Sequence, residues 1–164
     1  MLQSDRYAVV LCGMRQAPAA AGDGTESRVQ TVIDLKVLRE DPEAQIALTG
    51  DWNIAPRDDD VWSMDFFRGS THVTEAERAA FGAIETSFAD VVRPFTPGPG
   101  TYTYWDYTQL RFPKRQGMRI DFILASPALA PRVVNAEIVR DERKSGKNRI
   151  GSPSDHAPVF IDIN

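Results

Sequence analysis

The stretch that decides the fold is Gln45-Ile46-Ala47-Leu48-Thr49-Gly50-Asp51-Trp52-Asn53-Ile54-Ala55-Pro56. A short run of apolar residues ends at Gly50, which predicts a buried strand. Asp51 and Asn53 follow at i and i+2, and in an extended backbone this spacing sends both side chains to one face. Polar side chains at the end of such a strand are a common way for an α/β scaffold to build a site. The alternative is an Asx-type turn, in which Asp51 or Asn53 only satisfies local backbone groups.

Length and composition bound the class of protein. The 164 residues fit one domain, and 42% hydrophobic with 26% charged residues is the composition of an ordinary globular protein. No apolar run approaches the roughly 18 residues of a membrane-spanning helix, so no membrane partner is expected. The N-terminus lacks the features of a secretory signal, and the single cysteine, Cys12, fits a reducing compartment. These features predict a cytoplasmic protein.

The formal net charge of −4 averages over unlike regions of the chain. Residues 108–120 carry four cations and no acid: Arg111, Lys114, Arg115 and Arg119. A second basic cluster lies within residues 140–149. Local basic loops on an acidic body can hold a phosphate backbone in one groove, and the alternative is solvated loop charge.

The remaining pattern mixes strands and helices. Strands are predicted over residues 6–14, 102–107, 118–126 and 133–139 and after residue 156, and helices over residues 25–40, 61–67 and 75–88. Asp58 or Asp59 is expected to cap the second helix, and Thr74 with Glu77 forms a capping box for the third. We expect the acids 58–60 to be a solvated helix start and His72 to be a loop residue rather than a ligand. This order predicts an α/β or α+β layered sheet.

Polar residues recur at strand ends as Asp51, Asn53, Asp121, Asp155 and His156. Asp121 stands in an alternating apolar strand, where an unpaired carboxylate is costly, so it needs a donor. These residues are either independent turn residues or one convergent site. In one site, a carboxylate would fix the tautomer of His156, which could then donate to a phosphoryl oxygen. Other carboxylates would hold Mg²⁺ and orient a water for attack.

Four motifs bring up a family resemblance. They are Leu48-Thr-Gly-Asp-Trp-Asn-Ile-Ala-Pro, Tyr104-Trp-Asp-Tyr, Gly117-Met-Arg-Ile-Asp-Phe-Ile-Leu-Ala-Ser and Ser154-Asp-His-Ala-Pro-Val. In this order and spacing they resemble the exonuclease III and apurinic/apyrimidinic endonuclease family of the endonuclease/exonuclease/phosphatase superfamily. The resemblance covers residues 41–164 and leaves 1–40 as a divergent start. It implies a single truncated domain, part of a four-layered α/β sandwich, with the C-terminal sheet and flanking helices present and the N-terminal half missing.

The resemblance also implies a function and a set of roles. The family consists of DNA repair nucleases that hydrolyse phosphodiester bonds at abasic sites and 3′ ends of duplex DNA with Mg²⁺, for which Mn²⁺ can substitute. A bacterial member works at the nucleoid. By motif, Asp51 resembles the group that orients or activates water, Asn53 its partner at the scissile phosphate, and His156 the phosphate-binding imidazole. Asp121 resembles the carboxylate that orients His156. Further residues resemble a metal ligand and the substrate-binding set: Asp155 for the metal, and Tyr104, Trp105, Met118, Arg115 and Arg119 for the DNA.

The chain departs from the family at its start. The family's early Asn-Val-Asn and Gln-Glu motifs, the second of which holds metal, do not occur upstream of residue 41. Activity of this chain alone would therefore depend on groups supplied from elsewhere. The alternative is a catalytically inactive fragment that keeps residual DNA binding. Half a sandwich exposes an apolar sheet face, so self-association through that face is also expected.

Overall fold

The computed structural model describes residues 7–11, 40–144 and 152–164, with the first of these ranges described by its backbone. The strands are β1 (Tyr7–Leu11), β2 (Gln45–Asp51), β3 (Ala89–Asp90), β4 (Asp121–Ala125), β5 (Val133–Ile138) and β6 (Val159–Ile163). The helices are α2 (Met64–Phe67) and α3 (Glu75–Glu85), and five 3-10 turns join these elements. The helix predicted over residues 25–40 and Cys12 lie outside the described residues. No helix in the described ranges is long and apolar enough to cross a membrane.

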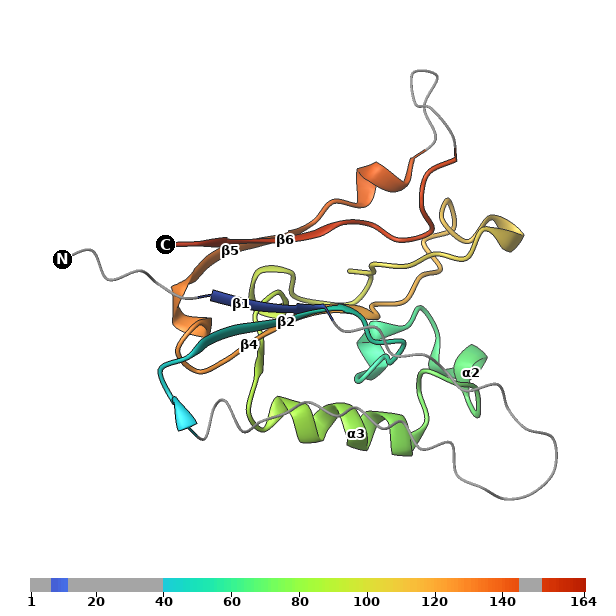
Figure 1. Ribbon diagram of the computed structural model, residues 1–164. Coiled ribbons are helices and arrows are strands. Elements are labelled where there is room, and N and C mark those ends of the chain that lie inside the picture. The colour runs from blue at the N-terminus through green and yellow to red at the C-terminus, as the bar shows by residue number, and fades with distance from the viewer. Residues whose placement is uncertain (1–6, 12–39, 145–151) are drawn as a thin grey trace.

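Two sheets and a helix form stacked layers. The larger sheet has the order β1-β2-β4-β3, with β1 parallel to β2 and β4 antiparallel to both of its neighbours. The smaller sheet pairs β5 with β6 antiparallel. Helix α3 covers one face of the larger sheet, and β5 and β6 lie over the other face (Figure 1). The mixed α/β fold class predicted from the sequence is confirmed.

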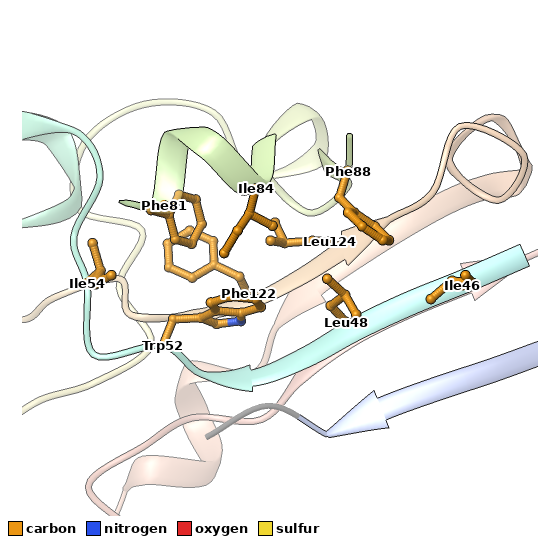
Figure 2. Close-up of a cluster of buried hydrophobic side chains, with 9 residues drawn as sticks. All are labelled: Ile46, Leu48, Trp52, Ile54, Phe81, Ile84, Phe88, Phe122 and Leu124. Carbon is orange, nitrogen blue, oxygen red and sulfur yellow. The ribbon is translucent and has the colours of Figure 1, made fainter. Parts of the chain in front are cut away.

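Even-numbered and odd-numbered residues of β2 and β4 lie on opposite faces of the larger sheet and belong to different core clusters. Even-numbered residues of both strands meet α3 in one cluster (Figure 2), which contains Ile46, Leu48, Trp52, Ile54, Phe81, Ile84, Phe88, Phe122 and Leu124. Odd-numbered residues, Ala47, Ile123 and Ala125, face the smaller sheet instead. Asp51 and Asp121 have the same parity as this second set and are register partners across β2 and β4. The two carboxylates therefore lie side by side on the face that meets the smaller sheet.

The helix after Asp58–Asp60 is shorter than predicted, and its cap differs. Helix α2 has only four residues, and its N-cap is Ser63, whose hydroxyl accepts the N–H of Phe66. Asp58 and Asp59 therefore do not cap it, and Asp60 is buried rather than solvated. The capping box that opens α3 forms as predicted, because Glu77 N–H donates to Thr74 Oγ1 and Thr74 N–H donates to Glu77.

The aromatic segment 102–107 does not form the predicted strand. Only Tyr104 makes isolated bridges, to Met118 and to His156. Strict alternation also fails, because Tyr102 and Trp105 are both buried in one cluster. Backbone hydrogen bonds instead tie the segment to Met118, before the start of β4, and to Asp155 and Ala157, before the start of β6.

Candidate functional site

An Asp–His pair stands between the two sheets. The Nδ1 atom of His156 lies 2.8 Å from Asp121 Oδ2. Since a carboxylate only accepts, Nδ1 carries the hydrogen, and the neutral ring has its acceptor at Nε2. The hydrogen bond to Asp121 raises the pKa of His156 above its usual value, more than burial lowers it. The donor that the sequence required for Asp121 is therefore the imidazole of His156.

The second carboxylate of the site is Asp51. Its Oδ2 lies 3.9 Å from Nε2 of His156, so the imidazole stands between two acids that are register partners. Like charges placed directly opposite in a sheet repel each other, and a protonated imidazole between them offsets that repulsion. Burial raises the pKa of Asp51, and the N–H of Asn53 and the charge of His156 act in the opposite direction. Asp121, His156 and Asp51 therefore form a row of carboxylate, imidazole and carboxylate, in which the imidazole can hold a proton.

Asp51 and Asn53 also form the local turn that was the alternative to a site. The N–H of Asn53 donates to Asp51 Oδ1 at 2.9 Å, and Asn53 has a φ of 52°. The left-handed conformation at Asn53 ends the extended backbone, so the expectation that both side chains share a face through i, i+2 spacing does not hold at this residue. The turn and the site therefore coexist in one stretch.

The site is built on backbone bonds that the sequence did not reveal. Thr103 is fully buried, and its hydroxyl accepts the N–H groups of both Ile120 and Asp121, each at 3.1 Å. The N–H of Trp105 donates to the carbonyl of Asp155, and the N–H of Ala157 donates to the carbonyl of Thr103. These bonds fix the residue pair 155–156 against β4. Thr103 had no sequence signal beyond its place between aromatic residues.

A cavity of about 270 Å³ lies next to Tyr104, and Asp51, Asp121 and His156 are not among its lining residues. Tyr104 and Met118, both predicted to contact substrate, line it, and the Tyr104 ring lies 5.0 Å from the His156 ring. Arg111, predicted as a cation of the basic loop, and His72, predicted as a loop residue, also line it. Other lining residues were missed by sequence reasoning: Trp62, Phe66, Phe67, Ser70, Thr71, Asp106, Gln116 and Gly117. Trp105 is not among them, because its ring is 1% exposed and packs on Tyr102 and Phe112. Trp105 is therefore a core residue rather than a wall of the cavity.

Arg119 is also placed differently from the prediction. Its side chain is 2% exposed and binds Asp90 through both terminal nitrogens, at 2.7 and 2.8 Å. Asp90 and buried Asp60 share a second cation, Arg93. Arg119 therefore belongs to an internal ion network and cannot contact DNA at the surface without leaving it.

The predicted basic surface is smaller than its composition suggests. Arg111 is buried, and its guanidinium lies over the rings of Trp62 and Phe66, at 5.1 and 4.6 Å. Lys114 and Arg115 are exposed on the loop between Arg111 and Met118. Arg115 remains available for the phosphate contact predicted for it.

The described residues do not complete a metal site. In residues 40–144 and 152–164, no group of three or more His, Cys, Asp or Glu side chains is arranged to hold a metal ion. Asp155 is half-buried beside His156, and its carboxylate contributes to the raised pKa of that imidazole. A small hard cation needs near-octahedral oxygen coordination, and this donor set alone does not supply it.

The structure therefore has a layered α/β fold with an Asp–His pair where its two sheets meet. Residues 6–156 match the Endonuclease/Exonuclease/phosphatase family, and the chain belongs to this family. Exodeoxyribonuclease III of Haemophilus influenzae is 32% identical over 131 residues, which span 75% of this chain and 47% of that protein. The exodeoxyribonuclease of Bacillus subtilis is 29% identical over 130 residues, which span 78% of this chain and 48% of that protein.

Solved structures agree with this family. An AP endonuclease from Archaeoglobus fulgidus superimposes with a TM-score of 0.66 and 33% identity, over 77% of this chain and 49% of that one. The 3′ phosphatase NExo from Neisseria, solved with a product DNA hairpin, gives a TM-score of 0.66 and 31% identity, over 73% of this chain and 45% of that one. The chain spans about half the length of the curated relatives it matches.

Proposed function

We propose that this chain takes part in DNA repair as a nuclease that hydrolyses phosphodiester bonds of duplex DNA at abasic sites and 3′ ends. The observation that carries the proposal is the row Asp121–His156–Asp51, with distances of 2.8 and 3.9 Å between successive side chains. Three sequence motifs far apart in the chain supply these three residues. The names of the relatives, which include exodeoxyribonucleases and AP endonucleases, support the same substrate class.

Each residue of the row has a proposed task. Asp121 holds His156 by its Nδ1–H, so that Nε2 faces the reacting phosphate and, when protonated, donates to a phosphoryl oxygen. Asp51 orients a water and takes its proton. Because burial raises its pKa, Asp51 is a stronger base than an exposed aspartate. Asn53 is proposed to contact the scissile phosphate.

The cavity beside the row is proposed to receive the sugar at the reacting position. Tyr104 and Met118 form its wall next to His156, and the exposed Arg115 is proposed to contact a neighbouring phosphate. A concave site next to the chemistry suits a nucleotide turned out of the duplex. Work at the bacterial nucleoid follows from this substrate.

Mg²⁺, with Mn²⁺ as a substitute, is proposed as the cofactor of the complete reaction. Asp155 is the carboxylate proposed to contact it, and the further oxygen ligands would come from the DNA and from a second polypeptide or copy of this chain. Self-association through the exposed face of β5 and β6 is the proposed route for a second copy; Val134 and Phe160 are exposed there beside Asn135, Glu137 and Asp162.

One observation favours a second candidate, DNA binding without hydrolysis. In residues 40–144 and 152–164, no three His, Cys, Asp or Glu side chains are arranged to hold a metal ion. In this case the basic loop around Arg115 would retain weak affinity for duplex DNA.

An incision assay separates the two candidates. A duplex with one abasic site is incubated with the chain and Mg²⁺, and cleavage is compared between wild type, Asp51→Asn and the control Asp65→Asn, whose side chain is 91% exposed. We expect cleavage by wild type and the control and a loss of at least about 100-fold in Asp51→Asn. Equal residual cleavage by wild type and Asp51→Asn would refute the nuclease proposal. DNA binding without any cleavage by wild type would support the second candidate.

A further inference from the structure

His72 belongs both to the cavity and to the turn that carries Asp51. Its ring lines the cavity together with Tyr104 and Met118. Its Nδ1 lies 2.6 Å from the carbonyl oxygen of Asn53. The sequence had indicated only a loop residue at this position.

The hydrogen bond to the carbonyl of Asn53 fixes the tautomer of the His72 imidazole. A carbonyl only accepts, so Nδ1 of His72 carries the hydrogen, in the neutral ring and in the cation alike. The backbone reinforces the contact, because the N–H of Ala55 donates to the carbonyl of His72 at 2.8 Å. The loop before α3 is therefore tied to the end of β2 at two points.

Both ends of this hydrogen bond have unusual backbone conformations. His72 has a φ of 76° and Asn53 a φ of 52°. Left-handed conformations are uncommon outside glycine and concentrate at functional sites, where the surrounding structure holds them. Asn and His are both enriched among the non-glycine residues that adopt this conformation. The surrounding hydrogen bonds hold the two left-handed residues in place.

A short chain of bonds leads from the cavity to the carboxylate. His72 holds the Asn53 carbonyl, and the N–H of Asn53 donates to Asp51 Oδ1 at 2.9 Å. Burial has the largest effect on the pKa of Asp51, and the charge of His72 is one of the groups that oppose it. The His72 ring, which lines the cavity, and the Asp51 carboxylate are therefore linked through the backbone of a single residue, Asn53.

We propose that His72 is a positioning residue that couples occupation of the cavity by a sugar ring to the placement of the Asp51–Asn53 turn. The proposal rests on the proposed nuclease function for its chemistry. In this proposal the cavity affects kcat as well as binding, because a ligand in the cavity sets the position of the catalytic base, Asp51. The class of ligand that would fill the cavity is a deoxyribose ring without a nucleobase.

Two substrates separate binding from coupling. One duplex carries a tetrahydrofuran ring as abasic analogue, and the other carries an acyclic propanediol linker with the same phosphates at the same place. We expect wild type to have a kcat about tenfold higher on the ring, the worth of one hydrogen bond. In His72→Gly the kcat ratio falls to about one, while the KM values keep their wild-type proportion.

Two further variants control for structure. Glycine adopts a φ of 76° without strain, so His72→Gly is expected to keep the fold, and thermal unfolding checks this. His72→Asn, which tolerates the same backbone and retains an N–H donor, should restore part of the ratio. Asp65→Asn, whose side chain is 91% exposed and does not line the cavity, is the matched control, and its ratio should match wild type. A wild-type ratio in His72→Gly would overturn the proposal.

A measurement independent of cleavage completes the test. The chain has two histidines, so long-range proton–nitrogen NMR spectra resolve both rings, and His72 should show a hydrogen on Nδ1. Addition of the uncleaved tetrahydrofuran duplex without metal should shift the amide signal of Asn53 in wild type and not in His72→Gly. No shift in wild type would overturn the coupling, whereas absence of cleavage by wild type would overturn only the nuclease function.

Discussion

Removal of Arg119 should destabilise the chain strongly, although the residue lies in a segment that the sequence assigned to DNA contact. The substitution Arg119→Met leaves Asp90, whose side chain is 4% exposed, with Arg93 at 3.3 Å as its remaining ion-pair partner. It also removes the guanidinium that lies 4.5 Å from the centre of the Phe122 ring. Loss of one partner from a buried ion pair costs about 3–5 kcal/mol.

Urea unfolding measures this cost. With a slope of about 2 kcal/mol per molar urea, a loss of about 4 kcal/mol lowers the midpoint by about 2 M. The surface pair of Arg68 and Asp65 is the control: its atoms are 3.0 Å apart, but the side chains are 78% and 91% exposed. Arg68→Met should cost less than about 1 kcal/mol.

A double variant tests whether the cost comes from the orphaned charge. Arg119→Met with Asp90→Leu removes both partners, and Asp60 keeps its 2.8 Å contact with Arg93. Replacement of a whole buried pair by apolar residues is often close to neutral, so most of the lost stability should return. A cost below about 1 kcal/mol for the single variant, or a double variant less stable than the single one, would refute the reasoning.

The same pair should make the chain sensitive to acid. Burial raises the pKa of Asp90, but the hydrogen bonds and charge of Arg119, together with Arg93, outweigh it and hold the pKa below its usual value. The unfolded chain then binds this proton more readily, so the stabilisation is present above about pH 4 and is lost as the pH falls through the folded pKa. Urea midpoints measured from pH 7 downward should fall more steeply for wild type than for the double variant.

Two further predictions concern the site and its support. Asp121→Asn should lower the pKa of His156 in an NMR titration, because the hydrogen bond to this carboxylate is the largest cause of the raised value; an unchanged pKa would contradict the pairing. Gly117→Ala should cost about 1–3 kcal/mol in thermal or urea unfolding, because the new Cβ would lie 2.5 Å from Trp105 Nε1. The matched change Gly82→Ala, inside α3 with no atom within 4 Å, should instead stabilise by about 0.5–1 kcal/mol, and equal effects of the two would count against the packing described.

The sequence predicted the elements whose signals are local. A short apolar run that ends at Gly50 predicted β2, and the alternation of apolar residues predicted β4 and, at Asp121, a carboxylate that needs a donor. The capping box at Thr74 and Glu77 likewise predicted the start of α3, since both partners lie within one helical turn. These features require no knowledge of which strands become neighbours.

The sequence failed where a charge or a ring acquires a partner from a distant segment. Arg119 has the local context of a basic loop, but Asp90, 29 residues away, draws it into the interior. Trp105 resembles a substrate-binding residue by motif, but it is buried in a cluster with Ala157 from the segment before β6. Composition cannot distinguish an arginine exposed to solvent from an arginine paired with a buried acid, because the residue type is the same in both cases.

The sequence offered a local turn and a functional site as alternatives at Asp51, and the structure contains both. An i, i+2 spacing predicts a shared face only while the backbone stays extended, and Asn53, with a φ of 52°, leaves that conformation. What brings Asp51 to the site is its odd parity in β2 and its register with Asp121, which place both acids against His156. The Asx turn then fixes Asp51 Oδ1 on the N–H of Asn53 and leaves Oδ2 on the side of the imidazole. A local turn is therefore the means by which one oxygen of the carboxylate is held while the other faces the proposed chemistry.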